Sequence, residues 1–332
     1  MRSQLVTLFY RMLKLSRGWP FRSLYSGKVQ ILMFHRVVAS KGENRIDNDG
    51  IEITEDYLDY LIRFYLKQGF SPLSINDLQT ALNSKDKKRY VVFTFDDGYY
   101  DNYEKALPIF EKYNIPFAVY IPTDLISRKQ FAWWYFIEDI IRDHSHLTYA
   151  YEGLEKTTGI ETKEQKAAFF MELRKMIQKD PATLASLIER YKPNMDSYHN
   201  LFLNPAQLAV LAQHPLVTIG SHSVSHPSLA NISNEASFNE IALSKTELEK
   251  MTGKKVKHFS YPFGTINDVG AREMDHAKKA GYLTAITTSY GDIHATTDLF
   301  NLPRIWTSEH NKETELLKSI FGINAYALRK AK

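Results

Sequence analysis

Two adjacent carboxylates, Asp96 and Asp97, are the first sign of chemistry in the sequence. They lie in the run TFDDG, which continues the apolar run YVVF and therefore ends a predicted buried strand. Functional sites of α/β proteins lie at the carboxyl ends of their strands. Neighbouring side chains there point in different directions, so one carboxylate can bind a cation while the other faces a reactant. Taken alone, the run also fits an ordinary Asp-Asp-Gly turn.

A second pattern places two His side chains four residues apart, at His222 and His226, directly after the β-rich run VTIGS. On one helical turn this spacing directs both imidazoles to the same side, which suits two nitrogen ligands on one metal ion. Together with one carboxylate they form a ligand set that leaves open positions for water. The two patterns together predict a metal centre with a spare carboxylate beside it.

Composition restricts the kinds of metal site and partner. The chain has 332 residues and no Cys, which excludes disulfides, thiolate nucleophiles and Cys-bound metal or iron–sulfur sites. Any metal must therefore be held by His, Asp or Glu. A hydrophobic share of 44% is typical of a folded protein, and a net charge of +4 is too small to indicate nucleic-acid binding.

A third run, SYPFG at 260–264, also follows a predicted strand. Pro and Gly on either side of Phe263 indicate a fixed loop, whose backbone N–H could point at a developing oxyanion. An ordinary strand-to-loop turn is the simpler interpretation of this run by itself.

These motifs must be positioned by a recurring unit in which a short β-rich run precedes a helical pattern. Alternation of this kind predicts a parallel α/β architecture, either a barrel or an open sheet. The predicted strands are 29–34, 70–73, 90–95, 117–121, 217–221, 256–261 and 283–287, and the predicted helices are 55–68, 75–82, 103–113, 234–251 and 268–280.

The alternation stops over about 123–215, where helical patterns follow one another at 131–141, 163–179 and 181–191. We expect a mostly helical insert within one catalytic domain spanning 29–332. The aromatic run WWYF at 133–136 could stack on sugar rings, but packing of the insert onto the main body is the favoured interpretation.

Residues 1–28 carry six basic side chains and no acidic one. Read as a helix, their apolar residues Leu5, Leu8 and Met12 share one face. The apolar run is too short for a signal peptide or for the ~20 residues of a transmembrane helix. We expect either peripheral contact with an anionic membrane surface or docking onto the protein itself.

With these motifs in this order, the sequence resembles the polysaccharide deacetylase family, which shares the chitooligosaccharide deacetylase homology domain (carbohydrate esterase family 4). TFDDG matches the family's first motif, and HSVSH at 222–226 matches its second, H-[ST]-x-x-H. SYPFG matches the third in a variant form. The resemblance extends from about Val29 to Ile305 and is interrupted by the insert.

The resemblance implies a distorted (β/α) barrel with fewer than eight regular strands and metal-dependent removal of acetyl groups from sugars. It implies that Asp97, His222 and His226 hold a divalent metal, usually Zn²⁺, and that Asp96 is the general base. The amide of Phe263 would stabilise the oxyanion. Such roles agree with the physics of metal-assisted hydrolysis.

The sequence departs from the family pattern in three places. The third motif of many members begins with Arg, whereas this chain has Ser260, and Arg304 is a candidate to replace that Arg. Asp292 is a loose candidate for the Asp of the fourth motif. The general acid of the fifth motif has no clear match, and His35 is the first candidate, with the alternatives being His294 and His310.

We therefore expect a hydrolase acting on carbon–nitrogen bonds other than peptide bonds, which removes acetate from an N-acetylated sugar of a polysaccharide, glycolipid or lipid-linked saccharide precursor. The alternatives are an amidohydrolase of the same fold that acts on a small non-sugar amide, and a catalytically silent carbohydrate-binding homologue. Without a visible export signal, the expected location is the cytoplasm, with peripheral contact at the inner face of the membrane.

Overall fold

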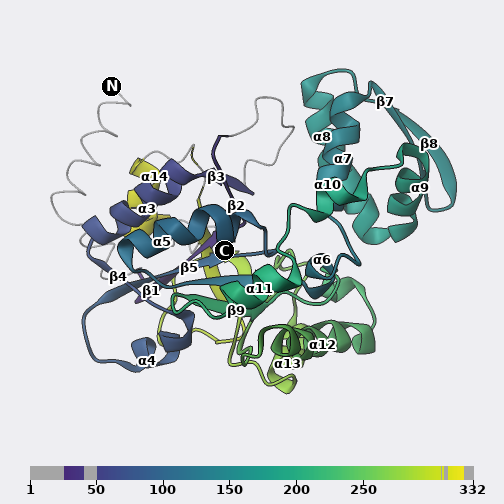
Figure 1. Ribbon diagram of the computed structural model, residues 1–332. Coiled ribbons are helices and arrows are strands. Elements are labelled where there is room, and N and C mark those ends of the chain that lie inside the picture. Colours follow the sequence, from purple (N-terminus) through teal and green to yellow (C-terminus); the bar gives the residue numbers. More distant parts are fainter. Residues whose placement is uncertain (1–25, 41–50, 308, 310–312, 325–332) are drawn as a thin grey trace, which may run out of the picture.

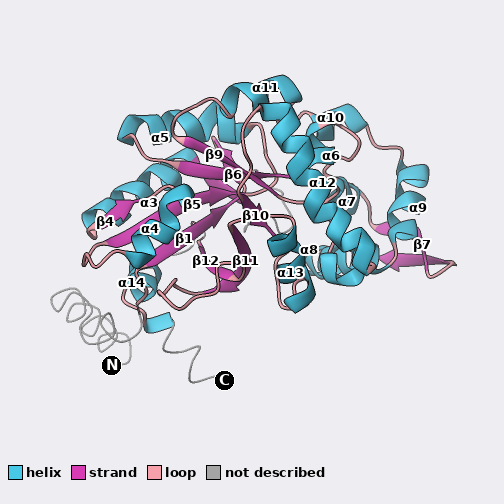
Figure 2. Cartoon of the chain, turned by 90° about the horizontal axis from the view of Figure 1, so that it is seen from below, coloured by secondary structure: helices cyan, strands magenta, loops and turns pink. Residues whose placement is uncertain are grey.

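The computed structural model describes residues 26–40, 51–307, 309 and 313–324. Within them a ring of seven strands is formed, in spatial order, by β1 (Val29–Phe34), β12 (Leu302–Trp306), β11 (Thr284–Tyr290), β10 (His258–Ser260), β9 (Val217–Ser221), β6 (Phe117–Ile121) and β5 (Arg89–Phe95). All neighbours in the ring are parallel, and β1 closes it by pairing with both β5 and β12. Figure 2 shows these strands in the middle of the molecule with helices around them. The predicted distorted barrel is confirmed, and the open-sheet alternative is wrong.

One more strand of the sheet lies outside the ring. This strand, β4 (Phe70–Pro72), pairs with the first residues of β5, while the later residues of β5 pair with β6 along the same edge. Two further strands, β2 (Arg36–Val38) and β3 (Glu52–Thr54), form a separate parallel pair just beyond the carboxyl end of β1.

The ring strands are apolar on both faces, as expected for a barrel covered by helices. Along β1, Ile31 belongs to the cluster inside the barrel and Leu32 to the cluster between barrel and helices. Along β5, Val92 likewise belongs to the cluster inside the barrel and Phe93 to the cluster between barrel and helices. Successive side chains of a strand point to opposite faces, so this alternation follows directly from strand geometry.

Helices cover the outside of the ring. They are α3 (Glu55–Lys67), α5 (Leu107–Tyr113), α11 (Pro205–Leu211), α12 (Asn234–Thr252), α13 (Ala271–Lys279) and α14 (Glu313–Ile320), whereas α4 (Leu78–Asn83) packs against the inner cluster. Shorter turns are the 3₁₀ turns Ile75–Asp77 and Leu229–Asn231 and the π-helical turn Asn102–Ala106. The helix α3 begins where the sequence predicts, because the Thr54 side chain accepts a hydrogen bond from the Tyr57 amide.

The chain between β6 and β9 forms the insert. It contains α6 (Thr123–Ile126), α7 (Trp133–Asp143), β7 (His146–Tyr151), β8 (Leu154–Gly159), α8 (Lys163–Lys179), α9 (Pro181–Tyr191) and α10 (Met195–His199) before α11. In Figure 1 the elements α7 to α10 and the β7–β8 hairpin form a lobe at one side of the barrel. The helices α8 and α9 have the bounds that the sequence predicts.

The β7–β8 hairpin is not anticipated by the sequence analysis. Its two central residues, Glu152 and Gly153, have φ angles of 51° and 75°. Positive φ at both positions is the requirement of a tight two-residue hairpin turn, for which Asn-Gly or Asp-Gly is the usual signal. Glu-Gly at this turn therefore lacked the usual sequence signature.

No helix in the described ranges has the length and apolar character needed to cross a bilayer. Most of the predicted basic segment, residues 1–25, lies outside the described residues.

Candidate metal centre

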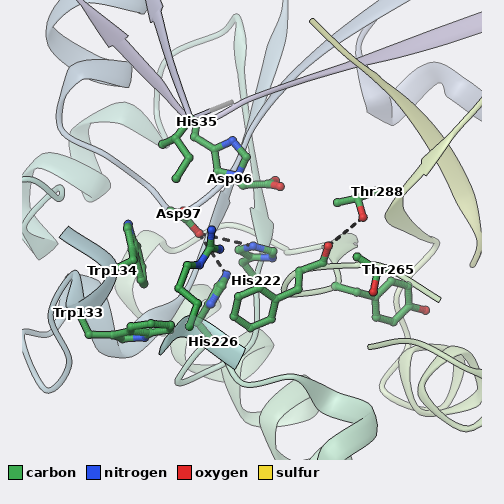
Figure 3. A pocket seen from close by; sticks show the side chains of 13 residues that line it. His35, Asp96, Asp97, Trp133, Trp134, His222, His226, Thr265 and Thr288 are labelled. Carbon is green, nitrogen blue, oxygen red and sulfur yellow. Dashed lines mark hydrogen bonds and ion pairs between the residues drawn. The ribbon is translucent and has the colours of Figure 1, made fainter. Parts of the chain in front are cut away.

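Carboxyl ends of the barrel strands meet around a cavity of about 280 Å³ (Figure 3). The barrel supplies most of its wall and the insert supplies one side. Its lining residues are His35, Ile51, Asp96, Asp97, Trp133, Trp134, Arg174, His222, His226, Tyr261, Phe263, Thr265 and Thr288. The runs 94–98, 222–226 and 260–264 thus meet in one place, as the strand-end argument predicts.

Three side chains in this cavity form a compact cluster of ligand type. Asp97, His222 and His226 each offer one atom, and these atoms all lie within 4.8 Å of one another. The Asp97 Oδ1 lies 3.6 Å from Nε2 of His222 and 3.4 Å from Nε2 of His226. Both imidazoles point toward the carboxylate in Figure 3.

The unsatisfied atoms of this cluster fit a bound cation. A hydrogen bond of 2.7 Å joins the His222 Nδ1 to the Ser260 carbonyl, so Nδ1 carries the proton and Nε2 keeps its lone pair. The buried Asp97 Oδ1 has no hydrogen-bond partner among the described residues. Burial, with Asp96 nearby, raises the pKa of Asp97, and burial lowers the pKa of His226. A divalent ion would supply the positive charge that this set lacks.

The backbone around the cluster is held in an unusual conformation. Asp97, Ser223 and His226 have φ angles of 71°, 67° and 58°. Each such residue costs about 1–3 kcal/mol and persists only where the surroundings enforce it. At Gly98, with φ 69°, an added Cβ would lie 2.7 Å from the end of the Ile121 side chain, so a larger residue there would have to displace that side chain and adopt a strained backbone conformation.

The expected helical turn between the two His residues is wrong. Residues 222–226 form an irregular loop, in which the His226 amide donates to the Ser223 hydroxyl at 3.0 Å. Glu240 of α12 accepts hydrogen bonds from the Val224 and Ser225 amides at 2.9 and 2.8 Å. The imidazoles meet because Glu240 fixes this loop, and sequence spacing alone did not identify Glu240.

Asp96 is paired with Arg304 in the interior of the site. The guanidinium contacts both carboxylate oxygens, at 3.0 and 2.7 Å, and both side chains are almost fully buried. It also donates to the Thr287 carbonyl at 2.9 Å and lies 3.4 Å from the Ser260 hydroxyl. Burial alone would raise the pKa of Asp96, but Arg304 and His222 hold it well below its usual range.

His35 lies at the carboxyl end of β1 and is half-buried in the cavity wall next to Asp96 (Figure 3). Burial, opposed in part by Asp96, lowers its pKa to about 4. The Asn102 side chain fixes the His35 carbonyl with a hydrogen bond of 2.8 Å. The structure therefore brings the first candidate for the general acid to the site.

The other candidates lie elsewhere. Next to His294, Ile293 bridges to Val29 at the amino end of β1, opposite the cavity. Asp292 accepts hydrogen bonds from the Gly27 amide and the Gln30 side chain at that same end. His310 lies outside the described residues.

Phe263 occupies a strained turn on the cavity wall. Its φ angle is 58°, and the Gly264 amide donates to the Pro262 carbonyl at 2.6 Å, which makes a γ-turn of the rare left-handed form. The Thr288 hydroxyl donates to the Phe263 carbonyl at 2.8 Å. The Phe263 amide has no hydrogen-bond partner among the described residues, so it is free to donate to a ligand.

Trp133 and Trp134 pack the insert onto the barrel, as the favoured interpretation of the aromatic run predicts. Both are largely buried, and the Trp134 Nε1 donates to the Tyr99 hydroxyl at 2.9 Å, so the insert packs on the barrel through them. Both also line the cavity. The cavity wall thus includes residues from helix α7 that the motif analysis did not assign to the site.

A closed parallel barrel with ionisable side chains gathered at its carboxyl ends is characteristic of (β/α)-barrel enzymes. The chain belongs to the polysaccharide deacetylase family, because the model of that family, described as polysaccharide deacetylase, matches residues 83–285. It is a hydrolase acting on carbon–nitrogen bonds other than peptide bonds.

One relative carries the same family name, and two solved structures share the fold. A Bacillus subtilis (strain 168) protein named "Putative polysaccharide deacetylase YxkH" is 22% identical over 283 residues, which cover 85% of this chain and 72% of that protein. The fold resembles that of the Streptococcus pyogenes deacetylase PplD in complex with acetate, with a TM-score of 0.60, 20% identity, and coverage of 89% of this chain and 99% of that one. IcaB from Ammonifex degensii gives a TM-score of 0.57 at 14% identity, with coverage of 90% and 98%.

Proposed function

We propose that the protein is a metal-dependent deacetylase that hydrolyses the acetamido group of an N-acetylated sugar in a polysaccharide, glycolipid or lipid-linked saccharide precursor. The observation that carries the proposal is the cluster of Asp97, His222 and His226 beside the buried carboxylate of Asp96. Family membership supports the acetylated saccharide as the substrate class.

Asp97, His222 and His226 would hold the ion, and two imidazole nitrogens with one carboxylate oxygen suit Zn²⁺. A bound Zn²⁺ acidifies water and polarises a carbonyl group. The buried Asp97 Oδ1, which has no hydrogen-bond partner among the described residues, offers the set a negatively charged ligand for a dication.

In this proposal Asp96 takes the proton from the attacking water. Arg304 holds the carboxylate through two contacts and keeps it ionised, so that it faces the cavity as a base. The free amide of Phe263 donates to the carbonyl oxygen as negative charge develops there. The carbon–oxygen bond forms, the carbon–nitrogen bond breaks, and the leaving amine needs one proton.

His35 is the group that we assign to deliver this proton. Its imidazole lies in the cavity wall, where burial lowers its pKa and the charge of Asp96 opposes that shift in part. A pKa of about 4 leaves it neutral before the reaction, so the proton taken up by Asp96 must pass on to His35 and then to the amine.

The proposed function is tested by release of acetate from N-acetylhexosamine oligomers. Wild-type protein should release acetate, a chelator should stop the release, and Zn²⁺ should restore it. Asp96→Asn should lower the rate by 100-fold or more, in line with the roughly 10²–10⁴-fold contribution of general bases, whereas Asp196→Asn, at an exposed position, should not. Hydrolysis of cyclic imides or ureides without any acetate release would contradict the sugar substrate.

We also propose that residues 1–28 bring the enzyme to an anionic membrane surface on the cytoplasmic side, where lipid-linked precursors of cell-surface polysaccharides would be accessible. The excess of six basic side chains supports this location. The protein should sediment with anionic liposomes at low salt, less so at high salt, and not after deletion of residues 1–27. Equal sedimentation of the shortened chain would contradict it.

A further inference from the structure

Tyr99, two residues after Asp97, connects the insert to the candidate metal centre. Its side chain is fully buried, and its ring stacks on Phe202 at 4.8 Å between centroids. Its hydroxyl accepts a hydrogen bond of 2.9 Å from the Trp134 indole. Phe202 and Trp134 both belong to the chain between β6 and β9, so one barrel residue receives contacts from two parts of the insert.

The insert also binds the backbone of this loop. The Leu203 amide donates to the Gly98 carbonyl at 3.0 Å, and the Tyr100 amide donates to the Leu201 carbonyl at 2.8 Å. These bonds make an isolated antiparallel bridge around Tyr99. The backbone that directly follows Asp97 is therefore held by the returning segment of the insert.

On the barrel side the same ring is held by a charged group. The Arg36 guanidinium lies 5.2 Å from the centre of the Tyr99 ring and forms an ion pair of 2.7 Å with Asp101. The Tyr99 ring is thus fixed between the insert and an ion pair of the barrel.

Contacts from this assembly reach two of the three candidate ligands. The Leu203 amide holds the carbonyl of Gly98, the residue directly after Asp97, with its hydrogen bond of 3.0 Å. The Trp134 ring lies 5.8 Å from the His226 imidazole, and both side chains line the cavity (Figure 3).

We propose that Tyr99 and Trp134 are positioning residues, through which docking of the insert orients Asp97 and His226 for metal binding. This inference rests on the proposed function only in assuming a metal at these ligands. Asp97 and His226 both have left-handed backbone conformations. Such conformations are strained in residues other than glycine and persist only where neighbouring contacts hold them. Loss of groups that orient metal ligands typically weakens metal affinity by about 10–100-fold.

The test is Zn²⁺ affinity, measured on the full chain by competition with a chromophoric chelator. Tyr99→Phe keeps the stacked ring and removes only the hydroxyl, and its Zn²⁺ affinity should fall by about 10-fold or more. Tyr100→Phe is the matched control, because that half-buried ring contacts Tyr103 and lines no part of the cavity. Its affinity should stay within about twofold of the wild type, as expected for a group that does not touch the ligands.

Trp134→Phe and the double variant show whether the two residues act together. If they act through their shared hydrogen bond, their effects should not be independent. The fold-loss of Zn²⁺ affinity in the double variant should then be smaller than the product of the fold-losses in the two single variants. Thermal unfolding of the metal-free proteins shows whether weaker Zn²⁺ binding comes from misplaced ligands or from loss of the fold. Each variant should be folded at the temperature of the titration.

Undiminished Zn²⁺ affinity in Tyr99→Phe would overturn the inference, as would losses that multiply independently in the double variant. A wild-type chain that binds no Zn²⁺ would overturn both the inference and the proposed metal centre. Weakened Zn²⁺ binding in a protein that releases no acetate from any saccharide would contradict the proposed function and leave the inference standing.

Discussion

The pair formed by Asp96 and Arg304 allows the sharpest quantitative prediction. The exposed fractions of the two side chains are 3% and 1%, and the guanidinium also donates to the Thr287 carbonyl. Replacement of Arg304 by Met keeps the apolar volume but leaves a buried carboxylate without its counter-charge. Breaking a buried ion pair in this way costs about 3–5 kcal/mol of unfolding free energy.

The assay is denaturant unfolding of the metal-free protein at neutral pH. Arg63→Met is the matched control, because Arg63 is 61% exposed in its pair with Asp59, and exposed pairs contribute about 0.2–1 kcal/mol. The double variant Asp96→Asn, Arg304→Met should be less destabilised than the sum of its two single changes, by about 1–3 kcal/mol.

The effect should also depend on pH in a defined direction. Arg304 holds the native pKa of Asp96 below the value of about 3.9 expected in the unfolded chain, so the stabilisation is present above that pH and is lost as the pH falls through the native pKa. Without Arg304, burial raises the pKa instead. The difference in stability between wild type and variant should therefore narrow as the pH falls. A loss no larger than that of Arg63→Met, or a difference independent of pH, would refute the assignment of this pair.

Three further outcomes follow from the site. His222→Ala should reduce bound divalent metal from about one ion per chain to a small fraction, measured by elemental analysis after desalting, and full retention would contradict the ligand assignment. Gly98→Ala should lower the free energy of unfolding by about 1–3 kcal/mol in a denaturant titration, because residue 98 has a positive φ and an added Cβ would contact Ile121. Unchanged stability would show that the turn can relax. His35→Ala should lower kcat by roughly 100-fold with metal content unchanged, whereas His294→Ala should leave kcat unchanged; equal rates would remove His35 from the mechanism.

The candidate metal centre could be predicted from the sequence because its ligands lie in short, recognisable motifs. Asp96 and Asp97 follow a recognisable buried strand, and parallel strands bring their carboxyl ends together, so the motif around His222 and His226 had to lie nearby. The helical spacing proposed for the two His residues failed, because Glu240 and local hydrogen bonds hold that loop in an irregular conformation.

Contacts between residues that are distant in the sequence were harder to predict. Arg304 was only a candidate from sequence, because no local pattern shows that β12 lies where its side chain reaches both Asp96 and Ser260. The contacts of Tyr99 with Phe202 and Trp134 had no sequence signal at all, since they join a barrel loop to two separate parts of the insert.

Local patterns were enough to predict the strand-end motifs, the absence of thiolate chemistry, the parallel α/β alternation and the helices α8 and α9. These features depend on neighbouring residues and on periodicity, which one chain segment carries alone. The folded chain was needed to distinguish a barrel from an open sheet, to pair Arg304 with Asp96, and to place Trp133 and Trp134 on the cavity wall. Each of these depends on which distant segments pack together, and that is settled by closure of the ring and docking of the insert.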